Sequence, residues 1–201
     1  VLVDPESHNP TVTDNERIIL ALTAIGKDPA NVGGKNLLTA LQDRNIMQVT
    51  DTSKTDINGL VFGLLALNSG NYTQDSYWLV QAILTQRNKD GSWSSSADTK
   101  PDGDVDMTAM ALQALAAYRS EAAVAAAVTR GLDVLSAMQT GDGGFASSGV
   151  VNAESAAQVI VACTALGIDP DADSRFVKDG GSAVDALLTF YDAGAAAFRH
   201  K

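Results

Sequence analysis

The chain contains 201 residues, of which 45% are hydrophobic, and this is enough for one domain with a sizeable core. It carries 14 basic and 24 acidic residues, and the net charge of −10 argues against nucleic acid or an anionic membrane surface as a partner. No stretch approaches 18 consecutive apolar residues, so no membrane-spanning helix is predicted. The single cysteine, Cys163, excludes an internal disulfide and any metal site built from several thiolates.

Residues 1–13 contain Pro5 and Pro10 and show no apolar periodicity, which predicts an extended lead-in. The chain begins at Val1 without an initiator methionine or a signal peptide, and we expect it to be a piece excised from a larger protein. A single repeat domain is predicted over residues 14–201.

Beyond the lead-in, apolar helices alternate with amphipathic ones. Asp14 is the expected N-cap of an apolar helix that stops at Gly26, and a one-sided amphipathic helix is expected over residues 32–45. The next apolar helices are predicted to follow the N-caps Asp56, Asp106 and Ser155. Three further helix pairs are predicted, over 57–67 and 74–87, over 107–118 and 121–139, and over 156–166 and 181–198. The apolar helix after Asp56 is expected to end near Gly70 and the one after Ser155 at Gly167, and the final helix is expected to break at Gly194.

An internal repeat supports this alternation. Residues 23–29 and 164–170 agree at five of seven positions with an offset of 141, and the predicted caps are spaced by 42, 50 and 49 residues. We therefore predict an all-α chain of four stacked αα-hairpins, each with an inner buried and an outer amphipathic helix. Their expected bounds are about 14–46, 56–88, 106–139 and 155–198.

Two loops share a motif in which a glutamine is followed by Asp-Gly and then by an aromatic residue. Glycine allows a left-handed turn after a helix, and the aromatic ring has about 150–250 Å² of surface to bury against the next unit. We assign these residues a structural role: Gln86, Asp90, Gly91 and Trp93 in the first copy, and Gln139, Asp142, Gly143 and Phe145 in the second.

These two motifs resemble the repeats of the prenyltransferase and squalene oxidase superfamily, which includes squalene-hopene cyclases, protein prenyltransferase β-subunits and cobalamin carriers of the intrinsic-factor type. The resemblance implies an α/α toroid, in which inner helices surround a cavity and outer helices form a ring. Four hairpins are fewer than a closed toroid needs, so we expect a partial one whose end helices expose apolar faces that a neighbouring domain or a second copy would cover.

The chemistry of that superfamily transfers poorly. Prenyltransferases hold zinc with an Asp, a Cys and a His, whereas Cys163 lies within a helix and His8 and His200 lie at the two chain ends, so no zinc set is expected. Cyclases use an acid in an Asp-x-Asp-Asp motif, and its nearest counterpart, residues 102–106, lacks the adjacent pair. This favours a protein without catalytic activity.

The same acidic loop is a candidate site for one metal ion, Ca²⁺. Asp102, Asp104 and Asp106 alternate along the chain and present carboxylate oxygens, which Ca²⁺ prefers, although the spacing does not match an EF-hand loop. No other cofactor is expected. If the fold encloses a binding cavity, the region around Trp93, Asp104 and Phe145 is the predicted place for it.

We therefore expect a non-catalytic repeat module of a secreted or cell-surface protein, which binds a ligand or a protein partner or spaces neighbouring domains. The first alternative is a terpene cyclase-like enzyme with Asp104 or Asp106 as the acid. The second is a carrier for a cobalamin-type ligand in the concave cavity, by analogy of fold alone.

Overall fold

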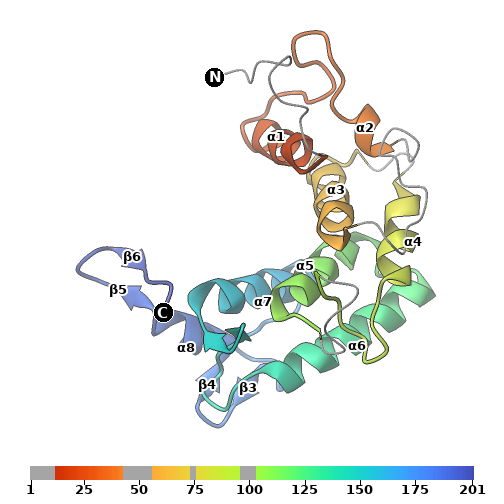
Figure 1. Cartoon of the computed structure of the whole chain (residues 1–201). Coiled ribbons are helices and arrows are strands. Elements are labelled where there is room, and N and C mark those ends of the chain that lie inside the picture. Colours follow the sequence, from red (N-terminus) through yellow and green to blue (C-terminus); the bar gives the residue numbers. More distant parts are fainter. Residues whose placement is uncertain (1–11, 43–55, 73–75, 96–102) are drawn as a thin grey trace. The chain divides into compact units, whose positions relative to one another are not determined.

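The computed structural model describes residues 12–42, 56–72, 76–95 and 103–201. These residues are mostly helical and contain only short antiparallel strand pairs, so the all-α prediction is confirmed (Figure 1). The chain divides into two compact units, the first ending at Gln86 and the second beginning at Arg87. Within the described residues, no helix has the length and apolar character needed to cross a membrane.

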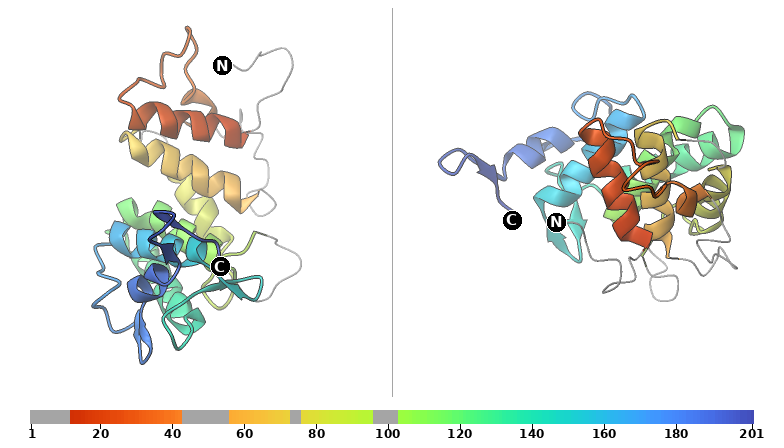
Figure 2. Two further views of the ribbon diagram at one scale, coloured as in Figure 1. Left: turned by 90° about the vertical axis from the view of Figure 1, so that its left-hand side faces the viewer. Right: turned by 90° about the horizontal axis from the view of Figure 1, so that it is seen from above.

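The first unit contains α1 (Val12–Ala24), α2 (Thr39–Gln42), α3 (Ile57–Ser69) and α4 (Tyr77–Thr85). The N-cap predicted at Asp14 is wrong, because Asp14 lies in the first turn of α1, and residues 12–13 of the predicted extended lead-in are helical; residues 1–11 lie outside the described residues. Helix α1 packs along α3, and α3 packs against α4 (Figure 2). The predicted cap of α3 is confirmed, because the Asp56 side chain accepts a hydrogen bond from the Asn58 backbone N–H at 3.1 Å. This cap fixes where the most apolar helix of the unit begins.

The helix predicted over residues 32–45 is wrong over residues 32–38, and only Thr39–Gln42 is helical in the described part. Val32 and Lys35 instead form a tight bridge, and the intervening Gly33 and Gly34 have φ angles of +58° and +81°. Two successive left-handed residues are incompatible with a right-handed helix, so the helical turn starts only at Thr39. Residues 43–45 lie outside the described residues.

The second unit contains the longer helices α5 (Val105–Leu115), α6 (Ala122–Met138) and α7 (Ala153–Ala165), which pack side by side with α5 between the other two (Figure 1). A 3₁₀ turn η1 (Ala116–Tyr118) extends α5, and the short helix α8 (Ala183–Leu188) packs on α7. Three two-residue hairpins complete the unit: β1 (Ala146–Ser147) with β2 (Val150–Val151), β3 (Val177–Lys178) with β4 (Gly181–Ser182), and β5 (Tyr191–Asp192) with β6 (Ala197–Phe198).

Two predicted caps of the second unit are wrong. The Asp104 side chain, not that of Asp106, accepts a hydrogen bond from the Met107 backbone N–H at 2.9 Å. The Asn152 side chain likewise accepts from the Ser155 backbone N–H at 2.8 Å, so Ser155 lies within the first turn of α7 rather than before it. The N-caps Asp56, Asp104 and Asn152 are consequently spaced at regular intervals of 48 residues.

The predicted helix stops at Gly26 and Gly167 are confirmed. Both glycines are left-handed, with φ of +68° and +75°, and each closes its helix with the same pair of backbone bonds. Gly26 N–H donates to Thr23 at 3.0 Å and Lys27 N–H to Leu22 at 2.8 Å; the corresponding bonds at the second site run from Gly167 to Thr164 at 3.0 Å and from Ile168 to Cys163 at 2.9 Å. This is the Schellman motif, which satisfies carbonyls left over at a helix end.

Helix α3 ends in the same way, one residue later than predicted. Gly70 has φ −122°, and Asn71, with φ +57°, is the left-handed residue. Asn71 N–H donates to Asn68 and Tyr72 N–H donates to Leu67. The stops at Gly26, Asn71 and Gly167 place α1, α3 and α7 in one register, in which α1 precedes α3 by 45 positions and α3 precedes α7 by 96.

The final helix is shorter than predicted. It starts at Ala183 after a capping box in which Ser182 and Asp185 exchange hydrogen bonds, and it ends at Leu188, before the break expected at Gly194. The chain then turns into the β5–β6 hairpin, where the rings of Tyr191 and Phe198 lie 5.3 Å apart.

Candidate functional site

The first motif loop is a compact turn built on backbone bonds. Asn88 N–H donates to the Ser92 carbonyl at 2.9 Å, and Gly91 N–H donates to the Asn88 carbonyl at 3.0 Å. The carboxylate of Asp90 accepts from the Ser92 N–H at 2.9 Å and from the Ser92 hydroxyl at 2.6 Å. Burial opposes ionisation of Asp90, but these bonds outweigh it and lower the pKa of that carboxyl.

The second motif loop repeats this geometry. Thr140 N–H donates to the Gly144 carbonyl at 2.9 Å, and Gly143 N–H donates to the Thr140 carbonyl at 3.0 Å. The Thr140 hydroxyl donates to Asp142, and this bond lowers the pKa of the Asp142 carboxyl. The left-handed glycine predicted for both loops is confirmed, since Gly91 has φ +106° and Gly143 has φ +87°. In each loop the aspartate is therefore a turn residue.

Each motif aromatic is enclosed and linked by a backbone hydrogen bond to the start of a following helix, α5 for Trp93 and α7 for Phe145. Trp93 and Phe145 both have 0% exposed surface. The Trp93 carbonyl accepts from Asp104 N–H at 2.9 Å, and the Phe145 carbonyl accepts from Asn152 N–H at 3.2 Å. Thr108 adds a buried link, because its hydroxyl accepts from Trp93 N–H and donates to the Trp93 carbonyl. The structure thus brings Trp93 and Asp104 together, but as parts of a helix start.

The motif glutamine of the second loop is a buried bridge. The Gln139 side-chain amide donates to the Gly143 carbonyl at 2.9 Å and to the Phe176 carbonyl at 2.8 Å. Phe176 is itself fully buried, and its carbonyl also accepts from Ala183 N–H at 3.1 Å. Sequence reasoning missed this third aromatic, although its spacing from the next helix start resembles that of Phe145 from Asn152.

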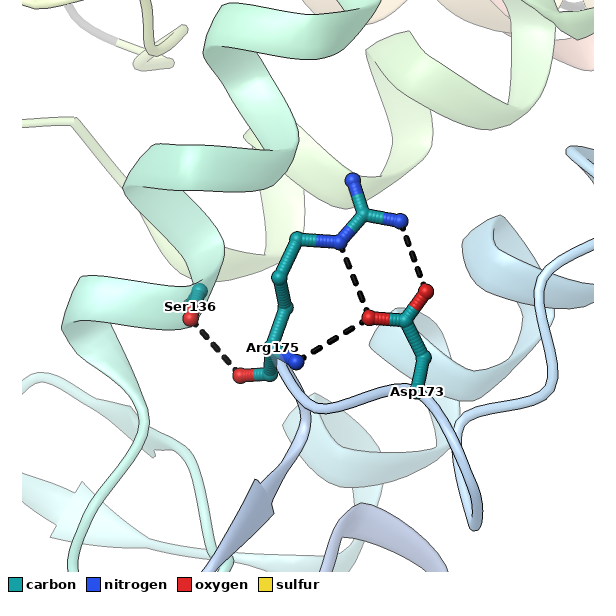
Figure 3. Close-up of polar contacts among 3 residues, drawn as sticks. All are labelled: Ser136, Asp173 and Arg175. Carbon is teal, nitrogen blue, oxygen red and sulfur yellow. Dashed lines mark hydrogen bonds and ion pairs between the residues drawn. The ribbon is translucent and has the colours of Figure 1, made fainter.

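A bidentate ion pair lies within the loop before Phe176, and a separate hydrogen bond joins this loop to α6 (Figure 3). The Arg175 guanidinium donates to both Asp173 oxygens, at 2.9 and 2.8 Å, and Ser136 on α6 donates its hydroxyl to the Arg175 carbonyl at 2.7 Å. The hydrogen bonds from Arg175 lower the pKa of Asp173 to about 2. The two charges are paired with each other, so this geometry fits a structural ion pair rather than a ligand site.

The acidic loop proposed for calcium is described only in part, because Asp102 lies outside the described residues. Asp104 is engaged as the α5 N-cap, and Asp106 follows in the first turn with a buried Oδ1 that has no hydrogen-bond partner. In the described ranges, no group of three or more Asp, Glu, His or Cys side chains is placed to hold a metal ion. The calcium site stays a prediction.

The most unusual titratable group is Glu16 on α1. Its side chain has 0% exposed surface, and neither carboxyl oxygen has a hydrogen-bond partner. Burial, and to a smaller extent the negative charge of Asp56, raise its pKa to about 8 against the opposing effect of Arg17. With this raised pKa, the protonated form of Glu16 predominates at pH 7.

Glycine 63 on α3 provides the space for this carboxyl. A Cβ atom added to Gly63 would lie 3.2 Å from Glu16 Oε1 and 3.7 Å from side-chain carbons of Leu41 and Leu79. The Glu16 carboxyl therefore lies close to the α3 backbone at Gly63, and side chains of Leu41 and Leu79 approach the same glycine. Sequence reasoning missed Glu16; its signal is a position on the same helical face as the fully buried Ile19.

The described surface also has a shallow pocket along α6, lined by Asp90, Arg130, Asp133, Val134, Ala137 and Met138. The Arg130 Nε donates to the Asp90 carbonyl at 2.7 Å, which links this pocket to the first motif loop. Its lining contains no nucleophile, and Cys163 lies elsewhere, buried in α7 with a thiol pKa that burial raises to about 12.

No protein family model, curated protein or solved structure matches this chain.

Proposed function

We propose that the chain is a non-catalytic α/α toroid repeat module of the prenyltransferase and squalene oxidase type, in a secreted or cell-surface protein, where it binds a protein partner or spaces neighbouring domains. Support for a repeat array comes from the regular spacing of the helix caps and from the shared backbone geometry of the helix stops and motif loops.

The proposal rests on one observation, that the candidate site residues have structural roles. Trp93 and Phe145 are enclosed anchors, Asp104 is a helix cap, and Asp90 and Asp142 are turn residues. Groups engaged in this way stabilise turns and helix starts and are not free to act on a substrate. Glu16, the buried acid described above, lies beside Gly63 of α3 and has no hydrogen-bond partner.

The test is a thermal melt of the chain alone and with Ca²⁺, a corrinoid or an isoprenoid diphosphate in separate samples. A ligand at about 100 times its dissociation constant adds roughly 2.7 kcal/mol, and at this chain length each kcal/mol moves the midpoint by about 2–4 °C. We expect no shift with any of the three. A shift with one compound would replace the proposal by a binding function for that class of ligand.

A turnover assay covers the cyclase-like alternative. The chain is incubated with isoprenoid substrates, and products are analysed by mass spectrometry for the native protein, Asp104→Asn and, as a matched control in a turn, Asp142→Asn. We expect no product in any sample. Turnover that is lost in Asp104→Asn but kept in Asp142→Asn would establish an enzyme with Asp104 as its acid.

A further inference from the structure

The two described pairs of inner helices pack by a common rule. In the first unit, the face of α1 that includes Glu16 and Ile19 lies on the face of α3 that includes Gly63. The register set by the helix stops and caps equates Glu16 and Ile19 with Ala109 and Leu112 on α5, and Gly63 with Val159 on α7. We call the face that holds Glu16 and Ile19, or Ala109 and Leu112, the rear face of its helix. The face that holds Gly63 or Val159 is called the front face.

The second unit obeys the same rule. Helix α7 packs against α5, and the Gln158 amide of α7 donates to Gln113 of α5 at 3.3 Å, beside these faces. The α5 rear face is buried, with Ala109 and Leu112 at 0% exposure, and Leu112 also lies beside Gly131 of α6. The α7 front face is equally buried, at Val159, Ala162 and Cys163. A rear face therefore belongs against the front face of a following inner helix.

Helix α1 has an unpaired front face. It consists of Ile18, Ala21 and Leu22, at the positions that are buried in α3 as Gly63, Ala66 and Leu67 and in α7 as Val159, Ala162 and Cys163, and of Ile25, whose counterparts Gly70 and Leu166 are half-buried. Ile18 is 39% and Ile25 68% exposed, Ala21 is exposed and Leu22 is half-buried. Within the described residues, these side chains form an apolar stripe at helical spacing that no other element covers fully.

Helix α7 has an unpaired rear face. It consists of Ala157, Ile160, Val161 and Thr164, which correspond to Ala109, Leu112, Gln113 and Ala116 of α5. Val161 is 43% exposed, Thr164 is exposed, and Ile160 is only half-buried, whereas Leu112 is fully buried. A front face and a rear face are the two kinds of surface that meet in the α1–α3 pair and in the α5–α7 pair. The front face of α1 and the rear face of α7 are therefore of complementary kinds.

We propose that a second copy of this chain covers these faces, with the rear face of α7 in one copy packed on the front face of α1 in the next. The second copy is the occupant because it carries a surface of the required kind, and because the contact continues the packing seen between α1 and α3 and between α5 and α7. The inference rests on the proposed function, since it names the protein partner.

The contact joins two different surfaces, so it is heterologous and each copy keeps one free end. A net charge of −10 on every copy opposes association at low ionic strength, while the faces themselves are apolar. Association should therefore strengthen with salt, which is the opposite of the behaviour expected for a contact held by ion pairs.

The test measures molar mass by sedimentation equilibrium at about 5–200 μM protein, in low and moderate salt. We expect mass to rise with concentration and with salt. Ile25→Lys on the front face and Val161→Lys on the rear face should each weaken association about tenfold or more, because a charge is placed in an apolar contact. Val150→Lys, at a residue of similar exposure (42%) on β2, is the matched control and should associate like the native chain.

Mixing the two variants separates this contact from general stickiness. Ile25→Lys retains a rear face and Val161→Lys retains a front face, so an equimolar mixture should form a one-to-one dimer that grows no further. A native chain that stays monomeric throughout, or a mixture that does not dimerise, overturns the inference. Neither result affects the proposed function, which fails instead on turnover or on a ligand-dependent melt.

Discussion

Glu16 occupies a repeat position that holds an alanine in the second unit, at Ala109 of α5. The size of its side chain is accommodated by Gly63, whereas the partner position on α7 is the larger Val159. The two packed pairs thus exchange large and small residues. What the exchange leaves in the first unit is a carboxyl group with no polar partner, and such a group is stable only when it is protonated.

This makes stability depend on pH. The folded-state pKa of about 8 exceeds the usual 4.5, so the folded chain binds the proton more tightly than the unfolded chain does. The stabilising contribution is complete below pH 4.5 and is lost as the pH rises to about 8, at about 1.4 kcal/mol per pH unit as an upper estimate. We expect urea unfolding to show lower stability at pH 8 than at pH 5.5, and Glu16→Gln to remove most of that difference.

Asp173 provides a control of opposite sign. Its pKa is lowered to about 2, so its contribution is present above the usual 3.8 and is lost as the pH falls towards 2. Asp173→Asn should therefore leave the slope between pH 5.5 and 8 unchanged. A native chain whose stability is flat over this range would contradict the buried, unpartnered state of Glu16.

At the scale of the elements, local hydrogen bonds decide where the inner helices begin. Helix α7 has two candidate caps three residues apart, and only Asn152 reaches a free backbone N–H. Ser155 is buried within the first turn, and its hydroxyl has no hydrogen-bond partner. The two side chains therefore contribute very differently to the stability of the helix, although serine and asparagine are almost equally good caps in general.

Substitution by alanine distinguishes the two positions. Asn152→Ala should lower stability by about 1 kcal/mol, or about 2–4 °C in the melting midpoint, because it removes the cap. Ser155→Ala should change stability by about 0.5 kcal/mol or less, because it removes an unsatisfied hydroxyl. Thermal melts of the two variants side by side measure this. The reverse order of effects would show that Ser155 is the cap.

At the scale of the whole molecule, the chain consists of two compact units, and the titrating group described above lies in one of them. We expect hydrogen-exchange protection factors, corrected for the intrinsic rate, to fall in α1 and α3 between pH 5.5 and 8 while those in α5 and α7 are maintained. An equal loss in both units would mean that the chain unfolds as one cooperative body. Glu16→Gln serves as the control, since it should keep α1 and α3 protected at both pH values.

Short-range features of this fold were predictable from the sequence. The alternation of apolar and amphipathic helices, the stops at Gly26 and Gly167, and the left-handed glycines Gly91 and Gly143 depend on neighbouring residues along the chain. Backbone sterics and periodicity are local properties, so the all-α class and the repeat offset of 141 residues follow from them. The helix that was wrongly predicted over residues 32–38 also has a local cause, the pair Gly33 and Gly34, whose turn preference outweighs the apolar stripe around it.

Tertiary structure alone decided the rest. The burial of Glu16 beside Gly63, and the exposure of Ile18 at a position that is buried in α3 as Gly63 and in α7 as Val159, depend on what lies opposite. Sequence periodicity shows that a helix has an apolar face, but whether that face is covered depends on another element, which is distant along the chain or belongs to another molecule. That is why the internal repeat could be recognised in the sequence, whereas the exposure of single residues on an apolar face, such as Ile18 and Val161, was visible only in the fold.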